Sequence, residues 1–280
     1  MGGLHMNTNE PIGMIAGNGI YPATFAHAAR KAEVACLVAA AFKNETEESL
    51  SGLVDVIDWF RVGQLGKMIK FFKKEGVTQA VMVGQIAPKN LFDLRPDMRT
   101  LLLLGRLKER NAESLFNGIG EELAKDGITL LPATTFLEDL LPAAGHICGP
   151  KPSKQVTRDM AYGFKIAKEV SRLDIGQTVV VRGGTVLAVE AFEGTNETIQ
   201  RGGKMGKGKA VMVKVSKPNQ DFRFDVPVIG PATIDTAAEA GVTAIVVEAG
   251  CTLLLGRDEL FDKCQSLGVT LLATDEISNT

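Results

Sequence analysis

The stretch "PIGMIAGNGIYPATFAHAARKAE", residues 11–33, contains the pattern from which the fold can first be predicted. It opens with an apolar run long enough for one buried strand. Gly17-Asn18-Gly19 interrupts this run, and a segment with the periodicity of an amphipathic helix follows, with Pro22 in its first turn, where a missing N–H costs little. A strand, a glycine-rich turn and a helix in this order are typical of the first unit of a parallel α/β sheet.

The same alternation continues through the first half of the chain. Further apolar runs predict strands at 34–41, 56–62, 79–86 and 128–136. Amphipathic segments predict a helix at 65–76 and a largely helical stretch at 97–125, broken near 110–111. Because strands alternate with helices, we expect a parallel sheet with helices on both faces in an N-terminal domain over residues 11–145.

The second half has a different rhythm. "GHICGPKPSK", residues 145–154, has two prolines and two glycines in ten residues, which predicts a linker at 146–152. A long helical pattern follows, and then two β segments on either side of Gly183-Gly184, a hairpin signal. These patterns predict α+β structure with antiparallel content for the second half, in a domain over residues 153–278. The fold class expected for the whole chain is α/β.

Composition narrows the classes of function. Lys plus Arg number 31 and Asp plus Glu 33, a net charge of −2, which does not indicate nucleic-acid binding. The longest apolar run contains Glu248 and is shorter than the ~18 residues that a membrane-spanning helix needs. No secretory signal is visible, so we expect a soluble, cytoplasmic protein. The chain has neither HExxH nor GxSxG, which argues against zinc and serine hydrolases.

Two glycine-rich stretches admit more than one interpretation. Gly17-Asn18-Gly19 could be a structural turn, a phosphate contact or part of a dinucleotide site, although Pro22 stands where the fingerprint needs glycine. "GKMGKGKA", residues 203–210, resembles a P-loop, but Ala210 stands where Ser or Thr is required and a β-rich run follows. We expect either a solvated turn or a mobile basic lid over an anionic ligand there.

Acidic residues occur in unusual places in the second half. "KPNQDFRFDVP", residues 217–227, alternates strictly, which predicts a strand with Asp221, Arg223 and Asp225 on one face. Glu190 and Glu248 each interrupt an apolar strand pattern. A carboxylate among apolar neighbours needs a partner or a metal, unless it lies at the surface. Carboxylate ligands suit Mg²⁺ or Mn²⁺, so a shared cation site is one interpretation of these residues.

Taken in order, several of these motifs resemble one known family. The motifs are "IGMIAGNGIYP" (12–22), "VGQLGKMIKFFKKEGV" (62–77), "RLDIGQTVVV" (172–181), "VLAVEAFEGTNETIQR" (186–201), "VKVSKPNQDFRFDVPVIGPATI" (213–234) and "VVEAG" (246–250). The chain resembles the UDP-2,3-diacylglucosamine pyrophosphatases of lipid A biosynthesis, of the two-domain class unrelated to calcineurin-like phosphoesterases. This resemblance implies metal-dependent hydrolysis, with Mg²⁺ or Mn²⁺, of a lipid-linked nucleotide sugar to UMP and 2,3-diacylglucosamine 1-phosphate. It also implies a Rossmann-like N-terminal domain, a distinct C-terminal α/β domain and peripheral association with the inner membrane.

The resemblance assigns roles to particular positions. Asp225 stands where the family has its essential aspartate, and Asp221, Arg223 and Asp225 are the candidate catalytic residues. The candidate metal ligands are Asp225, Glu190 and Glu248. The candidate substrate-binding residues are Gly17, Gly19, Gly63, Gln64, Gly66, Lys67, Gly84, Gln85, Glu193, Gly194, Thr195, Lys214, Lys217 and Gln220. Asn196 stands where the family usually has Asp. Gln85 lies in "MVGQI", a second stretch that differs from the family pattern.

Two alternatives stay open at this point. A nicotinamide-linked oxidoreductase would need an acid near the end of the second strand, where Glu45 is the first to occur. A nucleotide-sugar binding protein without catalysis would share the fold and the motifs. The oligomeric state is also open, a homo-oligomer included.

Overall fold

The computed structural model describes residues 8–86, 96–107 and 112–275. The chain forms two compact units. One consists of Met1–Leu137 together with Phe222–Asp225, and the other of Glu138–Asp221 together with Val226–Thr280. Both units are α/β, so the predicted fold class is confirmed. The break expected near residues 110–111 lies outside the described residues.

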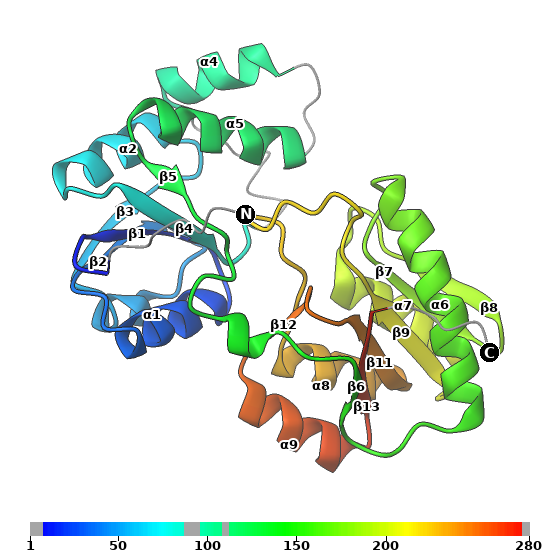
Figure 1. Cartoon of the computed structure of the whole chain (residues 1–280). Coiled ribbons are helices and arrows are strands. Elements are labelled where there is room, and N and C mark those ends of the chain that lie inside the picture. Colours follow the sequence, from blue (N-terminus) through cyan, green and yellow to red (C-terminus); the bar gives the residue numbers. More distant parts are fainter. Residues whose placement is uncertain (1–7, 87–95, 108–111, 276–280) are drawn as a thin grey trace. The chain divides into compact units, whose positions relative to one another are not determined.

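The N-terminal unit is built on a five-stranded sheet in the order β3-β2-β1-β4-β5, and its paired strands are parallel. The strands are β1 (Ile12–Ala16), β2 (Leu37–Phe42), β3 (Val56–Phe60), β4 (Gln79–Val83) and β5 (Thr129–Leu130). The helices are α1 (Tyr21–Lys31), α2 (Leu65–Lys74), α4 (Met98–Arg106) and α5 (Ala112–Lys125), with a 3₁₀ helix η1 (Glu48–Gly52). Figure 1 shows α1 on one face of the sheet and α2 and α5 on the other.

The central strands of this sheet are apolar because both of their faces are covered. Every residue of β1 is buried, and β2 is buried up to its last residue. On the face covered by α2 and α5, Phe72 and Leu123 pack with Ile15 and Ala40 in one core. An unbroken apolar run, rather than alternation, is what a parallel strand buried on both faces requires.

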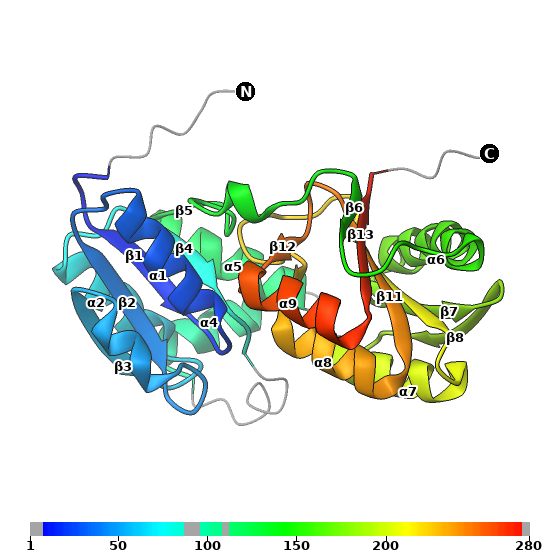
Figure 2. The same ribbon diagram turned by 90° about the horizontal axis from the view of Figure 1, so that it is seen from below.

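The C-terminal unit contains a six-stranded mixed sheet in the order β6-β13-β11-β9-β7-β8 and a small sheet of β10 and β12. The strands are β6 (Gly145–Cys148), β7 (Thr178–Arg182), β8 (Thr185–Val189), β9 (Ala210–Lys214), β10 (Val228–Ile229), β11 (Val242–Glu248), β12 (Leu253–Leu254) and β13 (Thr270–Thr274). The helices are η2 (Glu138–Leu140), α6 (Lys154–Arg172), α7 (Thr195–Gly206), α8 (Pro231–Ala240) and α9 (Arg257–Leu267). Figure 2 shows α6 on one face of the sheet and α7, α8 and α9 on the other.

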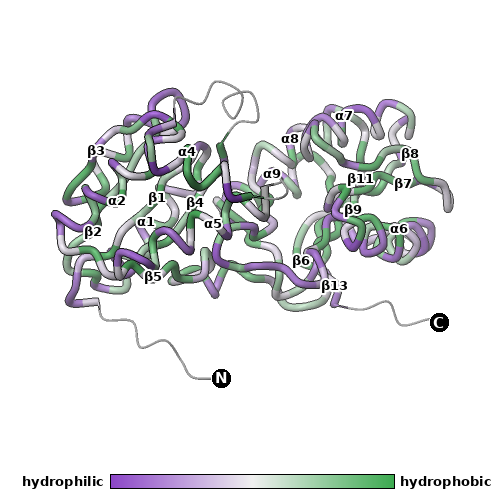
Figure 3. Tube along the Cα trace, turned by 90° about the horizontal axis from the view of Figure 1, so that it is seen from above, coloured by the Kyte–Doolittle hydropathy of each residue, from purple (hydrophilic) through white to green (hydrophobic). Residues whose placement is uncertain are grey.

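Side chains of this sheet alternate between two cores. Val179 and Val181 of β7 pack with Phe164 of α6, whereas Val180 between them packs with Ile199 of α7. In Figure 3 the strands β9 and β11 are mainly hydrophobic, while α6 carries hydrophilic residues along its outer side. Asp159 of α6 is buried and accepts hydrogen bonds from the N–H groups of Gly183 and Gly184. The β7–β8 hairpin is therefore attached to α6 at its turn.

Part of the segment predicted as a linker, residues 146–152, is a strand instead. β6 pairs antiparallel with the edge of β13, and Thr270 Oγ1 donates to Pro150 O. Glycine and proline after Cys148 do not prevent an edge strand before them, because such a strand needs hydrogen bonds on one side only. The C-terminal unit therefore begins earlier than the composition suggests, at Glu138.

The glycine-rich stretch at 203–210 is not a lid, which corrects the prediction. α7 continues to Gly206, and β9 begins at Ala210. A Cβ on Gly202 would lie 2.5 Å from Val180 Cβ, and one on Gly203 would lie 2.5 Å from Ala240 O. These glycines allow α7 to approach β7 and α8 closely, so they serve packing rather than mobility.

The strand predicted at 217–227 is also wrong. Residues 222–224 form a turn, and regular pairing resumes only at β10. Pro218 and Pro227 flank the segment, and neither can donate to a sheet ladder. The alternation of Phe222, Phe224 and Val226 therefore does not come from two faces of a strand, and the separation that a strand would impose on Asp221 and Asp225 does not apply.

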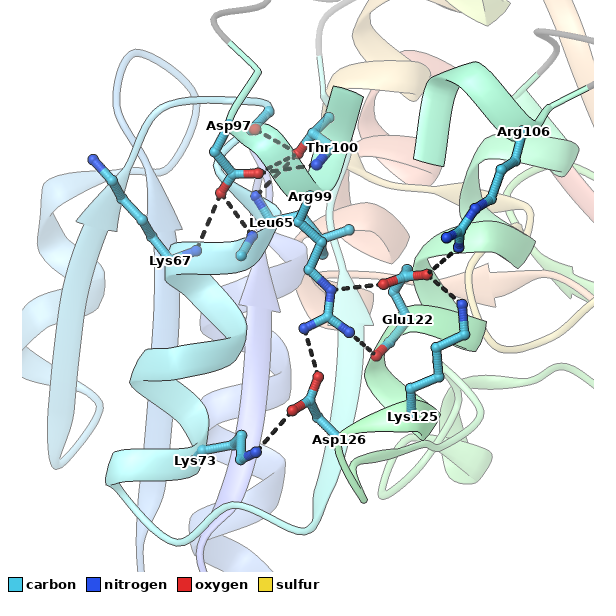
Figure 4. Close-up of polar contacts among 12 residues, drawn as sticks. Leu65, Lys67, Lys73, Asp97, Arg99, Thr100, Arg106, Glu122, Lys125 and Asp126 are labelled. Atoms are coloured by element: carbon cyan, nitrogen blue, oxygen red, sulfur yellow. Dashed lines mark hydrogen bonds and ion pairs between the residues drawn. The ribbon is translucent and has the colours of Figure 1, made fainter. Parts of the chain in front are cut away.

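Asp97 joins two helices of the N-terminal unit (Figure 4). Its Oδ1 accepts from Thr100 N at 3.0 Å and caps α4, while its Oδ2 accepts from Gly66 N at 2.7 Å and Lys67 N at 3.2 Å in the first turn of α2. Burial alone would raise the pKa of Asp97, but these hydrogen bonds hold the pKa below its ordinary value. A carboxylate is favourable at both positions because helix N-termini carry partial positive charge.

We expect Asp97→Ala to destabilise the N-terminal unit by ~2 kcal/mol, because one carboxylate caps one helix and binds the N-terminus of another. Trp59 in β3 is the single tryptophan of the chain, so its fluorescence during urea denaturation reports on this unit. Ser153→Ala removes the N-cap of α6 in the other unit. It should leave the urea midpoint of the Trp59 fluorescence change nearly unaltered. A Trp59 midpoint unchanged by Asp97→Ala would contradict the double-cap interpretation.

Candidate active site

The loops that follow β1 and β4 touch each other at the carboxyl end of the N-terminal sheet. Gly17 N donates to Val83 O at 2.8 Å, and Asn18 N donates to Gln85 O at 2.7 Å. A Cβ on Gly17 would lie only 2.4 Å from Gln85 O, so the residue must be glycine for the loops to meet. The predicted substrate residues Gly17, Gly84 and Gln85 are therefore brought together at the point where the strand order of the sheet reverses.

The acid that a nicotinamide site would need is engaged within this loop region. Gly17, the first glycine of the pattern, approaches the neighbouring loop, and the second glycine of a dinucleotide fingerprint, which approaches the pyrophosphate, would be Gly19. Glu45, the acid nearest the end of β2, is buried and accepts from Asn18 Nδ2 at 2.8 Å. Gly19 has φ +82° with no atoms near its Cβ position among the described residues. The geometry does not favour the nicotinamide alternative.

The predicted substrate residues at the start of α2 also have partners within the chain. The N–H of Leu65 donates to Thr100 Oγ1 at 3.3 Å, and those of Gly66 and Lys67 donate to Asp97. Gly63 O accepts from Thr100 Oγ1, and Gln64 Oε1 accepts from Arg61 N. The backbone donors at this helix N-terminus are thus engaged by Asp97 and Thr100, whereas the side chain of Lys67 is exposed.

Four residues from the second half of the sequence, Phe222–Asp225, belong to the N-terminal unit. Phe222 O accepts from Ala133 N at 2.6 Å, and the ring of Phe224 stacks on that of Phe116 in α5, with centroids 5.4 Å apart. Arg223 Nη2 donates to Asn117 Oδ1 at 2.9 Å. Asp225, the principal catalytic candidate, is half-buried and directly follows this anchored turn.

Glu190, Thr195 and Lys214 meet in the C-terminal unit. Lys214 is the last residue of β9, and its Nζ donates to Thr195 Oγ1 at 2.8 Å and lies 3.5 Å from Thr178 Oγ1. Thr195 Oγ1 in turn donates to Glu190 Oε1 at 2.9 Å, and Glu190 Oε2 lies 4.0 Å from the lysine nitrogen. The cluster combines an ammonium and a carboxylate with two hydroxyl groups at the ends of β8 and β9.

The lysine determines the protonation of this carboxylate. Burial would raise the pKa of Glu190, but the Lys214 ammonium, together with hydrogen bonds from Thr178, Thr195 and Gln177, holds the pKa below its ordinary value. Glu190 is therefore ionised at neutral pH, and the pair is a buried ion pair with hydrogen-bonded members.

Glu248 lies at the end of β11 in a similar arrangement. Both of its oxygens accept from Lys168 Nζ of α6, at 2.9 and 3.0 Å, and Oε2 also accepts from Ser216 N at 2.7 Å. Sequence reasoning missed Lys168 and Ser216, because the lysine is 80 residues from Glu248 and lies in an ordinary amphipathic helix. No local signal could have shown the pairing.

The other predicted residues of this unit lie in turns near the same strand ends. Lys217 pairs with Asp174 at 2.5 Å, and its N–H donates to Gln220 Oε1 at 2.8 Å. Glu193 pairs with Arg201 of α7 and accepts from Ala191 N. Gly194, at φ +91°, precedes the first residue of α7. Lysines and carboxylates thus gather where the strands end.

Two of the three predicted metal ligands, Glu190 and Glu248, belong to the C-terminal unit. Glu190 and Glu248 are each paired with a lysine, and an ammonium beside a carboxylate disfavours a cation there. Among residues 8–86, 96–107 and 112–275, no three His, Cys, Asp or Glu side chains gather closely enough to hold a metal ion. The two glutamates therefore do not fit the role that the sequence pattern suggested for them.

The two units define an α/β protein with a Rossmann-like first domain and with lysine–carboxylate pairs near the strand ends of the second domain. Comparison with known proteins gives the family. Residues 11–140 match the model of the LpxI N-terminal domain, and residues 143–272 match that of the LpxI C-terminal domain. The chain is 31% identical over 278 residues to the UDP-2,3-diacylglucosamine pyrophosphatase LpxI of Caulobacter vibrioides, covering 94% of this chain and 97% of that protein. The chain belongs to the LpxI family, which confirms the predicted resemblance.

We expect Lys214→Met to destabilise the C-terminal unit by ~3 kcal/mol at pH 7, because it leaves the buried Glu190 carboxylate without its cation. Urea denaturation followed by circular dichroism measures the loss. Lys263→Met is a matched control, since Lys263 pairs with the more exposed Asp235 in the same unit and the loss of such a solvent-exposed pair should be much smaller. Equal losses for the two variants would contradict the buried-pair argument.

The same variant has a predicted pH dependence. In the wild type the lowered pKa of Glu190 makes it stabilising above its unfolded pKa of ~4.3, and this contribution is lost as the pH falls through the folded pKa. Without Lys214, burial raises that pKa, so the ionised form opposes folding. The loss of unfolding free energy in Lys214→Met, relative to the wild type, should therefore become smaller as the pH falls from 7 to ~4.5. Adding Glu190→Gln should recover part of it at pH 7, with little further change on acidification.

Proposed function

We propose that the chain hydrolyses the diphosphate of UDP-2,3-diacylglucosamine to UMP and 2,3-diacylglucosamine 1-phosphate, a step of lipid A biosynthesis. The observation that carries the proposal is the identity with the Caulobacter pyrophosphatase, which extends through both domains. A lipid-linked nucleotide sugar is thus the proposed substrate. Binding of a nucleotide sugar without catalysis is the alternative outcome.

The polar groups of the two units suit a diphosphate ester. Hydrolysis of such an ester requires neutralisation of its negative charge and delivery of water in line with the leaving group. We assign charge neutralisation to Lys214, Lys217 and Arg223. Asp225 is assigned the orientation or deprotonation of the attacking water, a role that requires a fixed carboxylate. Its fixed position is supported by the stacking of Phe224 and the hydrogen bond of Arg223 beside it.

Dependence on Mg²⁺ or Mn²⁺ is part of the proposal. Mg²⁺ in proteins is commonly held by one or two carboxylates together with substrate phosphates. Asp225 is the candidate carboxylate, since Glu190 and Glu248 are engaged by lysines. Such an ion supplies charge neutralisation at the phosphates when it is bound.

The proposed substrate also indicates where in the cell the protein acts. A diacyl sugar nucleotide is anchored in a membrane by its acyl chains, so we place the protein in the cytoplasm in peripheral contact with the inner membrane. In the part of the chain that the structure describes, no helix has both the length and the apolarity to cross a bilayer.

Incubation with detergent-dispersed UDP-2,3-diacylglucosamine and Mg²⁺ or Mn²⁺ should release UMP, detected by mass spectrometry. In ¹⁸O-labelled water we expect the label in 2,3-diacylglucosamine 1-phosphate, because the proposed attack falls on the sugar-side phosphorus. A chelator should stop the reaction, and added Mn²⁺ should restore it. Substrate binding without UMP would support the non-catalytic alternative, and label in UMP would reverse the assignment of the attacked phosphorus.

Asp225→Ala should fold normally, bind substrate and lose about 10²–10³-fold in kcat, the usual cost of removing one transition-state group. UMP release measures the loss, and circular dichroism checks the fold. The control is Asp235→Ala, which removes a carboxylate of α8 that pairs with Lys263 of α9. This variant should leave turnover near that of the wild type. An Asp225→Ala enzyme with more than half of the wild-type activity would rule out the assigned role.

A further inference from the structure

Helix α4 of the N-terminal unit exposes its apolar side chains. Met98, Leu101 and Leu102 are 71%, 49% and 54% exposed, and their spacing of i, i+3 and i+4 places them in one strip. Figure 1 shows α4 beyond α2 and α5, on the side of these helices that faces away from the sheet. A strip of large apolar side chains on an outer helix is unfavourable in water unless something covers it.

Polar side chains attach α4 to the unit (Figure 4). Arg99 donates to Glu122 Oε2 of α5 at 2.6 Å and to Asp126, which directly follows α5, and Arg106 lies 3.4 Å from Glu122 Oε1. Asp97 is bonded to the first turn of α2, as described above. These contacts fix the rotation of the helix, so the strip cannot turn inward. The buried residues of α4 are Thr100 and Leu103, so the helix has large apolar side chains both inside and outside.

Within their bounds, α4 and its neighbour α2 carry basic side chains and no acidic ones, although Lys73 pairs with Asp126 and Lys74 with Glu75 just outside these helices. α4 contains Arg99 and Arg106 and no acidic residue, and Arg106 is exposed. The adjacent helix α2 also has no acidic residue within its bounds and has four exposed lysines, Lys67, Lys70, Lys73 and Lys74. Figure 4 shows Lys67 pointing away from the ionic contacts of Arg99. An exposed apolar strip beside basic side chains is the composition that binds at the surface of an anionic membrane.

We propose that the strip Met98, Leu101 and Leu102 of α4, with the lysines of α2, docks the N-terminal unit on an anionic lipid surface. This inference rests on the proposed function only in that its substrate would be held in such a surface. A second copy of the chain fits less well, because a stable homodimer buries ~800 Å² or more on each partner and three side chains on a nine-residue helix supply only part of that. Lysines also repel their own copies across a two-fold axis.

Flotation with lipid vesicles tests the proposal in the absence of substrate. The full-length protein should bind vesicles of phosphatidylcholine and phosphatidylglycerol and bind pure phosphatidylcholine far less. Leu101→Gln/Leu102→Gln should lower binding about tenfold, since two apolar side chains leave the interface. Lys70→Gln/Lys74→Gln should also lower it about tenfold and weaken its salt dependence. Leu267→Gln, which changes an exposed leucine of α9 in the other unit, should have no effect.

Other outcomes would overturn the inference. Vesicle binding unchanged by the leucine variant, or equal on both lipids, would exclude the strip as an anionic-membrane surface. A wild-type dimer that this variant converts to monomers, without vesicle binding by either form, would identify the strip as an interface between copies. UMP release from detergent-dispersed substrate separates the two proposals: release without vesicle binding refutes only the docking surface, and vesicle binding without release refutes only the proposed hydrolysis.

Discussion

Pairing of largely buried carboxylates with basic side chains is the constraint on which much of this structure depends. Removing an ion from water costs several kcal/mol, and only a close partner with additional hydrogen bonds offsets it. Glu122 meets Arg99, Glu190 meets Lys214 and Glu248 meets Lys168. Each pair connects different elements: α5 with α4, the end of β8 with β9, and β11 with α6. The ion pairs therefore determine where helices attach and how strand ends are arranged.

This constraint also decides what the acidic residues can do. A glutamate that compensates a buried lysine is not available as an independent metal ligand, and the geometry of Glu190 and Glu248 places both in that role. Asp225 differs from them because it follows a turn held by an aromatic stack and an arginine–asparagine hydrogen bond rather than a strand end. The position of Asp225 thus depends on the contacts of its neighbours Phe224 and Arg223, whereas the position of Lys214 depends on its own ion pair with Glu190.

Much of the regular structure could be predicted from the sequence, because unbroken apolar runs such as β1 and β2 and the Gly183-Gly184 hairpin have distinct local patterns. The errors arise where tertiary packing overrides them. Glycine destabilises a helix by ~1 kcal/mol per residue relative to alanine, so the glycine-rich end of α7 has the sequence of a loop. Only the structure shows that Val180 and Ala240 lie so close to α7 that the facing residues must be glycine. Alternation in 221–226 resembles a strand, although the flanking Pro218 and Pro227 already argue against one. The contact of Glu248 with Lys168 had no local signal, since it depends on a separation of 80 residues.

The four consecutive leucines at 101–104 show how a local pattern and a tertiary constraint combine. An α-helix has 3.6 residues per turn, so four consecutive side chains point around its whole circumference, and one face cannot bury them all. Asp97, Arg99 and Thr100 hold α4 by its polar groups, and this fixes which leucine enters the core. That leucine is Leu103, which packs against the helix α5 at Gly118. Leu101 and Leu102 then face outward because the capping and ion-pair contacts on the other side leave them no alternative.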